Sequence, residues 1–186
     1  MDGKGNVVEH PATYILDAFS KSVGEDMPPI VITGKPAGEK GFSFGSMSRN
    51  ANGDYAHTLG FIRYKSKHSV YHETMHNIDM SVRDYSGSNP KMLRLQELRK
   101  GITPAEVAAF KRVESRVKND REYVAYAMEQ LYDGRIEAGT LGKGVLKYVK
   151  AFFGEVKSAF SSSTLYNTPK YEGAVEYIKQ LDKTIH

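Results

Sequence analysis

The spacing of apolar residues predicts a β-rich first third followed by helices. Residues 12–22 carry apolar side chains at helical spacing and end at a glycine, which indicates a short amphipathic helix. The apolar run within 28–34 is bracketed by proline and glycine, as is typical of a buried strand. Residues 57–64 follow an Asn-Gly-Asp turn signal and favour a second strand, and 42–44 is a candidate for a third.

The remaining two thirds of the chain predict a series of helices. Ser66 or Ser69 is a candidate cap for a helix that continues to about Arg83. Thr103-Pro104-Ala105-Glu106 is a capping box with proline at the first helical position. The stripe of apolar residues in 142–160 indicates core or a subunit contact, with a membrane-surface helix as the alternative. The other predicted helices cover 91–100, 104–118, 121–132 and 171–183.

These elements indicate a single domain, residues 1–186, of the α+β class. A small mixed sheet is expected to pack on the helix that contains residues 72–76, and the C-terminal half is expected to be mainly helical. Residues 1–10 are expected to be flexible. A chain of 186 residues is long enough for one hydrophobic core. No apolar run approaches the roughly 18 residues of a membrane span.

Candidate chemistry enters with His72-Glu73-Thr74-Met75-His76, which has the pattern HExxH. Two histidines four residues apart project from one face of a helix, so that both imidazoles can bind one Zn²⁺. The glutamate beside the first histidine is then the general base that activates a metal-bound water. The alternatives are a chance pattern on a helix face and a structural metal site without catalysis.

A catalytic zinc needs a third protein ligand, and the chain has no cysteine to provide it. Glu122, at the start of a predicted helix, is the candidate, and Glu114 and Glu129 are the fallback ligands. The alternative for Glu122 is a capping-box carboxylate three residues after Asn119.

A wider pattern supports this ligand set. Residues 72–79 form HExxHxxD, and Asn119-x-x-Glu122 is followed by an aromatic residue and by alanines at 125 and 127. This combination resembles the gluzincin metallopeptidases of the anthrax lethal factor type, a group that also includes the Pro-Pro endopeptidases and many toxin or phage-encoded zincins. The resemblance implies a zincin-like fold, Glu122 as third zinc ligand, and Asp79 as the carboxylate that orients a ligand histidine. The alternative for Asp79 is a surface pair with Arg83, four residues later.

One position departs from that family, in which a tyrosine seven residues before the ligand glutamate stabilises the oxyanion. In this chain the position is Ser115. Loss of an oxyanion donor costs about 10²–10³-fold in turnover. The candidates for a replacement donor are Tyr126, Tyr166, Tyr171 and His57.

The expected function is therefore a zinc-dependent endopeptidase that acts on a protein or peptide, which is expected to pair with strand 57–64 as an edge strand. One alternative is a catalytically weak or inactive binding module of the same fold, for a protein or nucleic-acid partner. Another is a zinc hydrolase that acts on something other than a peptide, which HExxH alone also allows. Nucleic acid is not expected as a partner, since 26 basic and 22 acidic residues leave a charge of only +4 and form no long block. The absence of cysteine and of a secretory signal favours the cytosol, of its own cell or of one into which it is delivered.

Overall fold

The structure of the chain is a computed structural model in which side chains are described for most helical residues and for no strand residue. The predicted flexibility of residues 1–10 lies outside the described part of the chain. The described residues are 11–27, 30–34, 43–49, 55–61, 68–132, 134–161 and 172–185.

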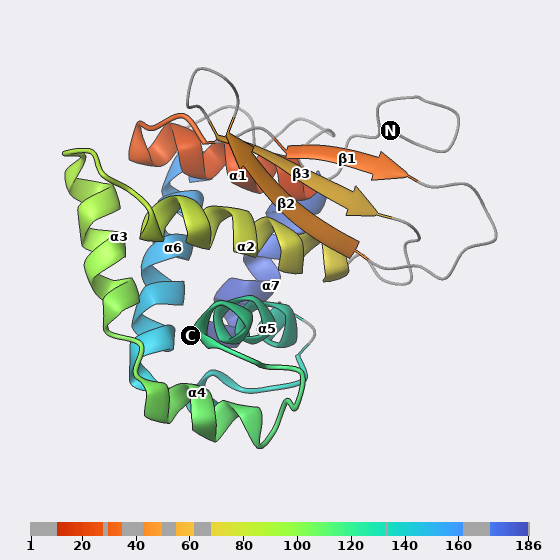
Figure 1. Ribbon diagram of the computed structural model, residues 1–186, viewed down its shortest axis with the longest axis vertical. Helices are drawn as coiled ribbons and strands as arrows, with labels where there is room; N and C mark the ends of the chain where they lie inside the picture. Colours follow the sequence, from red (N-terminus) through yellow and green to blue (C-terminus); the bar gives the residue numbers. More distant parts are fainter. Residues whose placement is uncertain are drawn as a thin grey trace.

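Helices form the packed body of the protein (Figure 1). Helix α2 lies across the centre of this body, with α5 and α3 packed against it and α6 packed against α1 and α3. In chain order the helical elements are α1 (Pro11–Val23), α2 (His68–Arg83), α3 (Pro90–Lys100), α4 (Pro104–Lys111), α5 (Asp120–Tyr132), the 3-10 turn η1 (Ala138–Thr140), α6 (Lys143–Ser161) and α7 (Glu172–Ile185).

The apolar stripe of α6 is the centre of the core. Val145, Val149, Phe152, Val156 and Phe160 recur at helical spacing, and each is at most 1% exposed. Burying a side chain of this size stabilises the fold by roughly 1.5–3 kcal/mol. The stripe is therefore core, as predicted.

Helix α4 shows where local chemistry ends a helix earlier than its pattern predicts. The predicted capping box is confirmed, because the Thr103 side chain accepts from the backbone N–H of Glu106 while the Glu106 carboxylate accepts from that of Thr103. The helix ends at Lys111, however, and not near residue 118. Glu114 accepts the backbone N–H of Arg116, and such side-chain-to-backbone bonds compete with helical hydrogen bonds.

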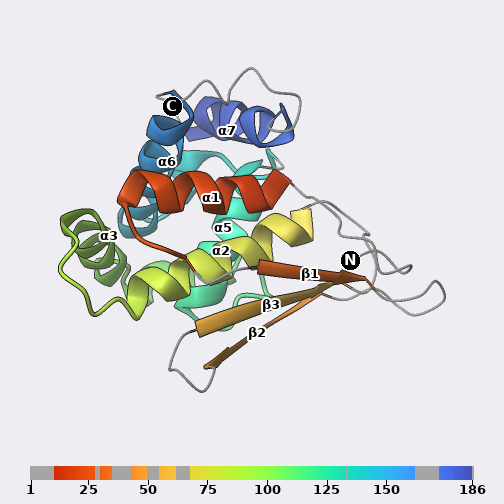
Figure 2. The same ribbon diagram turned by 90° about the horizontal axis from the view of Figure 1, so that it is seen from above.

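Three short strands lie beside the helical body: β1 (Ile30–Gly34), β2 (Ser43–Arg49) and β3 (Tyr55–Phe61). Their order is β1-β3-β2, with β1 parallel and β2 antiparallel to β3 (Figure 2). The prediction that strand 57–64 is an edge strand is wrong, since β3 lies between the other two; residues 62–64 are outside the described part. Strand β2 is an edge of the described sheet and contacts α2.

The predicted α+β, zincin-like fold class is wrong, because the described packed body of the protein is helical. A small mixed sheet does lie beside the HExxH helix, where β2 and β3 contact α2. All described core residues lie on helices or on the turns that join them, including the N-terminal helices α1 and α2. The strands are short, with five to seven residues each.

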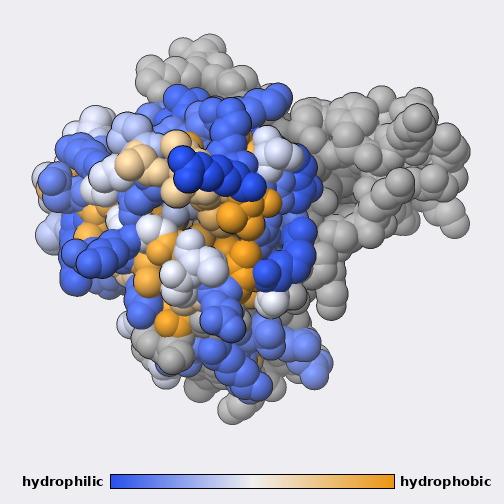
Figure 3. Space-filling model, turned by 90° about the horizontal axis from the view of Figure 1, so that it is seen from below, coloured by the Kyte–Doolittle hydropathy of each residue, from blue (hydrophilic) through white to orange (hydrophobic). Residues whose placement is uncertain are grey.

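Some apolar surface stays exposed on the helical body. Figure 3 shows apolar patches among hydrophilic side chains on the face viewed from below. The two large apolar side chains most exposed among the described residues are Leu93 on α3, at 42%, and Val113 after α4, at 71%.

A buried ion pair joins three helices in this body. Asp79 of α2 is 1% exposed, and its carboxylate accepts from Nε and Nη2 of Arg99 on α3, at 2.6 and 3.1 Å. Arg99 also lies 3.0 Å from a carboxylate oxygen of Asp120, the first residue of α5. Arg83 adds a longer contact of 3.3 Å to Asp79.

We expect Arg99→Met to lower the free energy of unfolding by about 3–5 kcal/mol, because Asp79 would stay buried without its main partner. Urea unfolding measures this change. Lys100→Met, at the neighbouring exposed position, is the matched control and should change stability by less than about 0.5 kcal/mol. Equal effects of the two substitutions would contradict the role given to Arg99.

Candidate metal centre

Helix α2 places the two histidines of the HExxH motif at the border of its buried face. Tyr71, Met75 and Ile78 of this helix enter the core, which fixes the rotation of the helix. His72 is 7% exposed, and the His76 side chain is 20% exposed. Their Nε2 atoms lie 3.2 Å apart. The two imidazoles therefore face the same point beside the helix.

Helix α5 brings Glu122 to this point. The Glu122 carboxylate lies 3.6 Å from Nε2 of His72 and 3.5 Å from Nε2 of His76. Asn119 accepts the backbone N–H of Glu122 at 3.0 Å, so the helix start is capped by Asn119 alone. Glu122 is therefore not a capping-box carboxylate, because its side chain points toward the histidines and not back to the start of the helix.

The spacing of these three groups fits a single metal ion. One ligand atom from each of His72, His76 and Glu122 lies within 4.8 Å of the others. Ligand atoms at 2.0–2.1 Å from a tetrahedral zinc are about 3.3 Å apart. The two Nε2 atoms lie 3.2 Å apart, close to that value, and the Glu122 carboxylate faces both, with Oε2 at 3.6 Å from His72 and Oε1 at 3.5 Å from His76. Two imidazoles and a carboxylate are also a donor set found in catalytic zinc sites.

The electrostatic environment of the cluster favours positive charge. Burial lowers the pKa of His72, but the carboxylates of Glu122, Glu129 and Glu73 act in the opposite direction and raise it to about 9. The two imidazoles in turn hold the pKa of Glu122 well below its ordinary value. A cation at this point, whether a proton or a metal ion, is thus stabilised by the surrounding carboxylates.

Glu73, the predicted general base, follows His72 directly on α2 and is half-buried. Its charge acts on the His72 imidazole. The role as general base stays a prediction.

The two fallback ligands have other partners. Glu114 accepts from Nε and Nη2 of Arg116, both at 2.7 Å, and from the Gln130 amide at 2.6 Å. Glu129 lies 2.9 Å from Nδ1 of His72, on the opposite side of the ring from Glu122. Glu122 is therefore the carboxylate whose position fits a third ligand.

Asp79 has different partners from those predicted. Its carboxylate is bound by Arg99 and contacted by Arg83, whereas the carboxylate found beside an imidazole is Glu129. The pairing with Arg83 does occur, but it is buried and not on the surface. The role of Asp79 as the partner of a ligand histidine is corrected accordingly.

One of the four proposed oxyanion donors lies against the site. The ring of Tyr126 contacts that of His72 edge-on, with 4.4 Å between centroids, and Arg116 lies 4.6 Å above the Tyr126 ring. Ser115, between Glu114 and Arg116, is exposed. The side chains of the other three candidates, Tyr166, Tyr171 and His57, lie outside the described residues.

The sequence named Glu129 only as a fallback ligand, without its contact at Nδ1 of His72, and did not identify Arg99. Glu129 lies seven residues after Glu122, on the same face of α5. Helical spacing could therefore have predicted that both carboxylates face the same neighbour. Arg99 is 20 residues from Asp79 and belongs to another helix. No local pattern connects those two positions.

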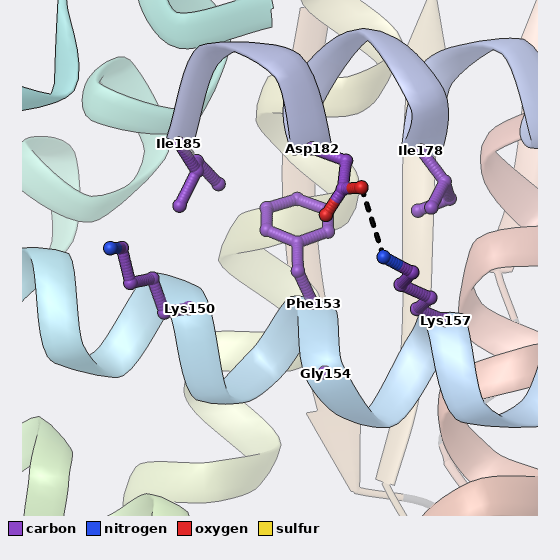
Figure 4. Close-up of a pocket in the computed structure, with 7 residues that line it drawn as sticks. All are labelled: Lys150, Phe153, Gly154, Lys157, Ile178, Asp182 and Ile185. Carbon is purple, nitrogen blue, oxygen red and sulfur yellow. Dashed lines mark hydrogen bonds and ion pairs between the residues drawn. The ribbon is translucent and has the colours of Figure 1, made fainter.

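A separate pocket lies between α6 and α7, away from the histidines (Figure 4). Phe153, Ile178 and Ile185 form its apolar wall. Lys157 pairs with Asp182 across it at 2.9 Å. None of the residues that line it comes from α2 or α5, so it is not an extension of the metal centre.

No model of a known protein family, no curated protein and no solved structure matches this chain. The resemblance to gluzincins within residues 71–132 stays a prediction. Among the described helices, none is both long enough and apolar enough to cross a membrane.

We expect the Glu114 carboxylate to stabilise the fold in a pH-dependent way. Hydrogen bonds from Arg116 lower the pKa of Glu114 from 4.5 to about 2 in the folded protein. The ionised form therefore stabilises the fold fully above pH 4.5, and this contribution is lost as pH falls toward 2. Glu114→Gln should lower the free energy of unfolding at pH 7 by about 1–3 kcal/mol.

Urea unfolding at several pH values tests this expectation. The difference between wild type and Glu114→Gln should shrink between pH 4.5 and 2, whereas Glu97→Gln, at an exposed glutamate, should match wild type throughout. A difference that is the same at pH 7 and pH 3 would contradict the assignment.

Proposed function

We propose that this protein is a zinc-dependent endopeptidase. The observation that carries the proposal is the meeting of His72, His76 and Glu122 from two helices, at separations that fit one zinc ion. It is supported by the position of Glu73, which directly follows the first of these histidines and is half-buried.

Each residue has a defined role in this proposal. His72, His76 and Glu122 hold the ion, which when bound supplies Lewis acidity and a water of lowered pKa. Glu73 accepts a proton from the attacking water and transfers it to the leaving amine. Tyr126, packed against His72, is the nearest described candidate for a group that contacts the developing oxyanion.

The proposed substrate is a protein or peptide in extended conformation, and not a nucleic acid. Strand β2 is an edge of the described sheet and contacts α2, the helix that carries the histidines. The backbone groups of an edge strand can pair with an added peptide strand. This moves the expected substrate edge from β3 to β2.

Metal content and peptide cleavage, measured on the same preparations, test the proposal. We expect one zinc per chain in wild type and in Glu73→Gln, and little zinc in His76→Ala and Glu122→Ala. Glu73→Gln should lose cleavage by about 10²–10⁴-fold, because only proton transfer is removed. Glu97→Ala, which removes an exposed carboxylate from α3, is the control for nonspecific metal binding and should match wild type.

Two results would contradict the proposal. Wild type that takes up no zinc would show that the HExxH pattern is only a helix face. Cleavage by Glu73→Gln at the wild-type rate would remove the proposed base. Zinc uptake without cleavage of casein or of a broad peptide library would instead favour the alternative, a metal-holding binding module without turnover.

A further inference from the structure

Three side chains on one face of α5 contact the His72 imidazole of α2. Glu122, Tyr126 and Glu129 are spaced at i, i+4 and i+7, so they lie along one face of the helix. All three contact His72: Glu122 at Nε2, Tyr126 against the ring, and Glu129 at Nδ1. The His72 ring is therefore held on three sides by α5.

Glu129 and Glu122 contact different nitrogens of the His72 ring. The two nitrogens of an imidazole point in different directions, and a metal bound at one leaves an N–H on the other. Nε2 of His72 faces His76 and Glu122, whereas Nδ1 is buried and faces Glu129 at 2.9 Å. The oxygen is within hydrogen-bond distance of Nδ1 but off the direction of the N–H, so a small rotation of the ring or of the carboxylate would complete the bond.

Arg135 holds the Glu129 carboxylate in place on the side away from His72. The other oxygen of this carboxylate accepts from Nη2 of Arg135 at 2.8 Å, and the Glu129 side chain is 13% exposed. Gly134, with φ of +65°, reverses the chain after α5, and the backbone N–H of Arg135 bonds back to Gln130. The turn thereby returns Arg135 to Glu129, which lies in the last turn of the helix.

Building on the proposed zinc site, we infer that Glu129 is the positioning residue for His72. Its carboxylate receives the Nδ1–H, selects the tautomer in which Nε2 is free for the metal, and fixes the plane of the ring. Arg135 limits the movement of that carboxylate. This is the task that the sequence predicted for Asp79, and here it falls to a residue of the facing helix.

Zinc affinity and the Co²⁺ absorption spectrum of the full chain separate positioning from ligation. Glu129→Ala should weaken zinc binding by about 10–100-fold in a chelator competition, the usual cost of losing a carboxylate behind a ligand histidine. Glu129→Gln should recover part of that loss, because the amide oxygen still accepts the N–H. Both variants should keep one Co²⁺ per chain, with visible bands of wild-type intensity, since no ligand is removed.

A double-mutant cycle tests the part of Arg135. Arg135→Ala should weaken zinc binding in the wild-type background, and its effect should vanish in Glu129→Ala. Glu137→Ala, an exposed glutamate two residues beyond Arg135, is the matched control and should bind zinc like wild type. Urea unfolding of the metal-free variants shows that each is folded before affinity is compared.

The possible outcomes distinguish this inference from the proposed function. Wild type that binds no zinc overturns both. Zinc binding and cleavage by wild type, with Glu129→Ala of equal affinity, overturns only the role of Glu129. Equal losses in Glu129→Gln and Glu129→Ala, with a changed Co²⁺ spectrum, would make Glu129 a ligand and overturn the positioning role.

Discussion

The arrangement of the site depends on the buried ion pair between Asp79 and Arg99. Asp79 belongs to the helix that carries the histidines, and Arg99 reaches from α3 to Asp120 at the start of the helix that carries Glu122. Charges taken out of water are costly unless their partners are well placed, so this pair tolerates few other arrangements of the three helices. The pair thus links the helix of the histidines to the helix of Glu122, although none of the paired residues touches the proposed metal.

Within that frame, α5 determines the state of His72. Three carboxylates act on this imidazole, Glu122 and Glu129 from α5 and Glu73 from α2, and they outweigh the burial that disfavours a charged ring. The same carboxylates would favour a metal ion at Nε2, which would replace the proton there. The same helix thus carries both the proposed third metal donor, Glu122, and the proposed positioning residue of His72, Glu129.

The errors in the sequence-based reading have physical causes. The runs predicted as strands at 28–34 and 57–64 overlap β1 and β3, but the described core is formed by helices and the turns between them, which the local pattern of a strand cannot predict. Strand order is set by pairing at a distance, so β3 could not be recognised as the central strand from its own residues. The early end of α4 arises from a local bond between Glu114 and Arg116 that helix propensity does not register.

What the sequence determined by itself is local: the helices and most of their boundaries, the capping box at Thr103, the buried stripe of α6, and the shared face of His72 and His76. These follow from side-chain periodicity within a few turns of helix. Only the tertiary structure decided that Glu122 meets the histidines, that Glu129 and not Asp79 lies beside the His72 imidazole, and that Asp79 pairs with Arg99. Those contacts join different helices, and their geometry depends on how the apolar faces of the helices pack together.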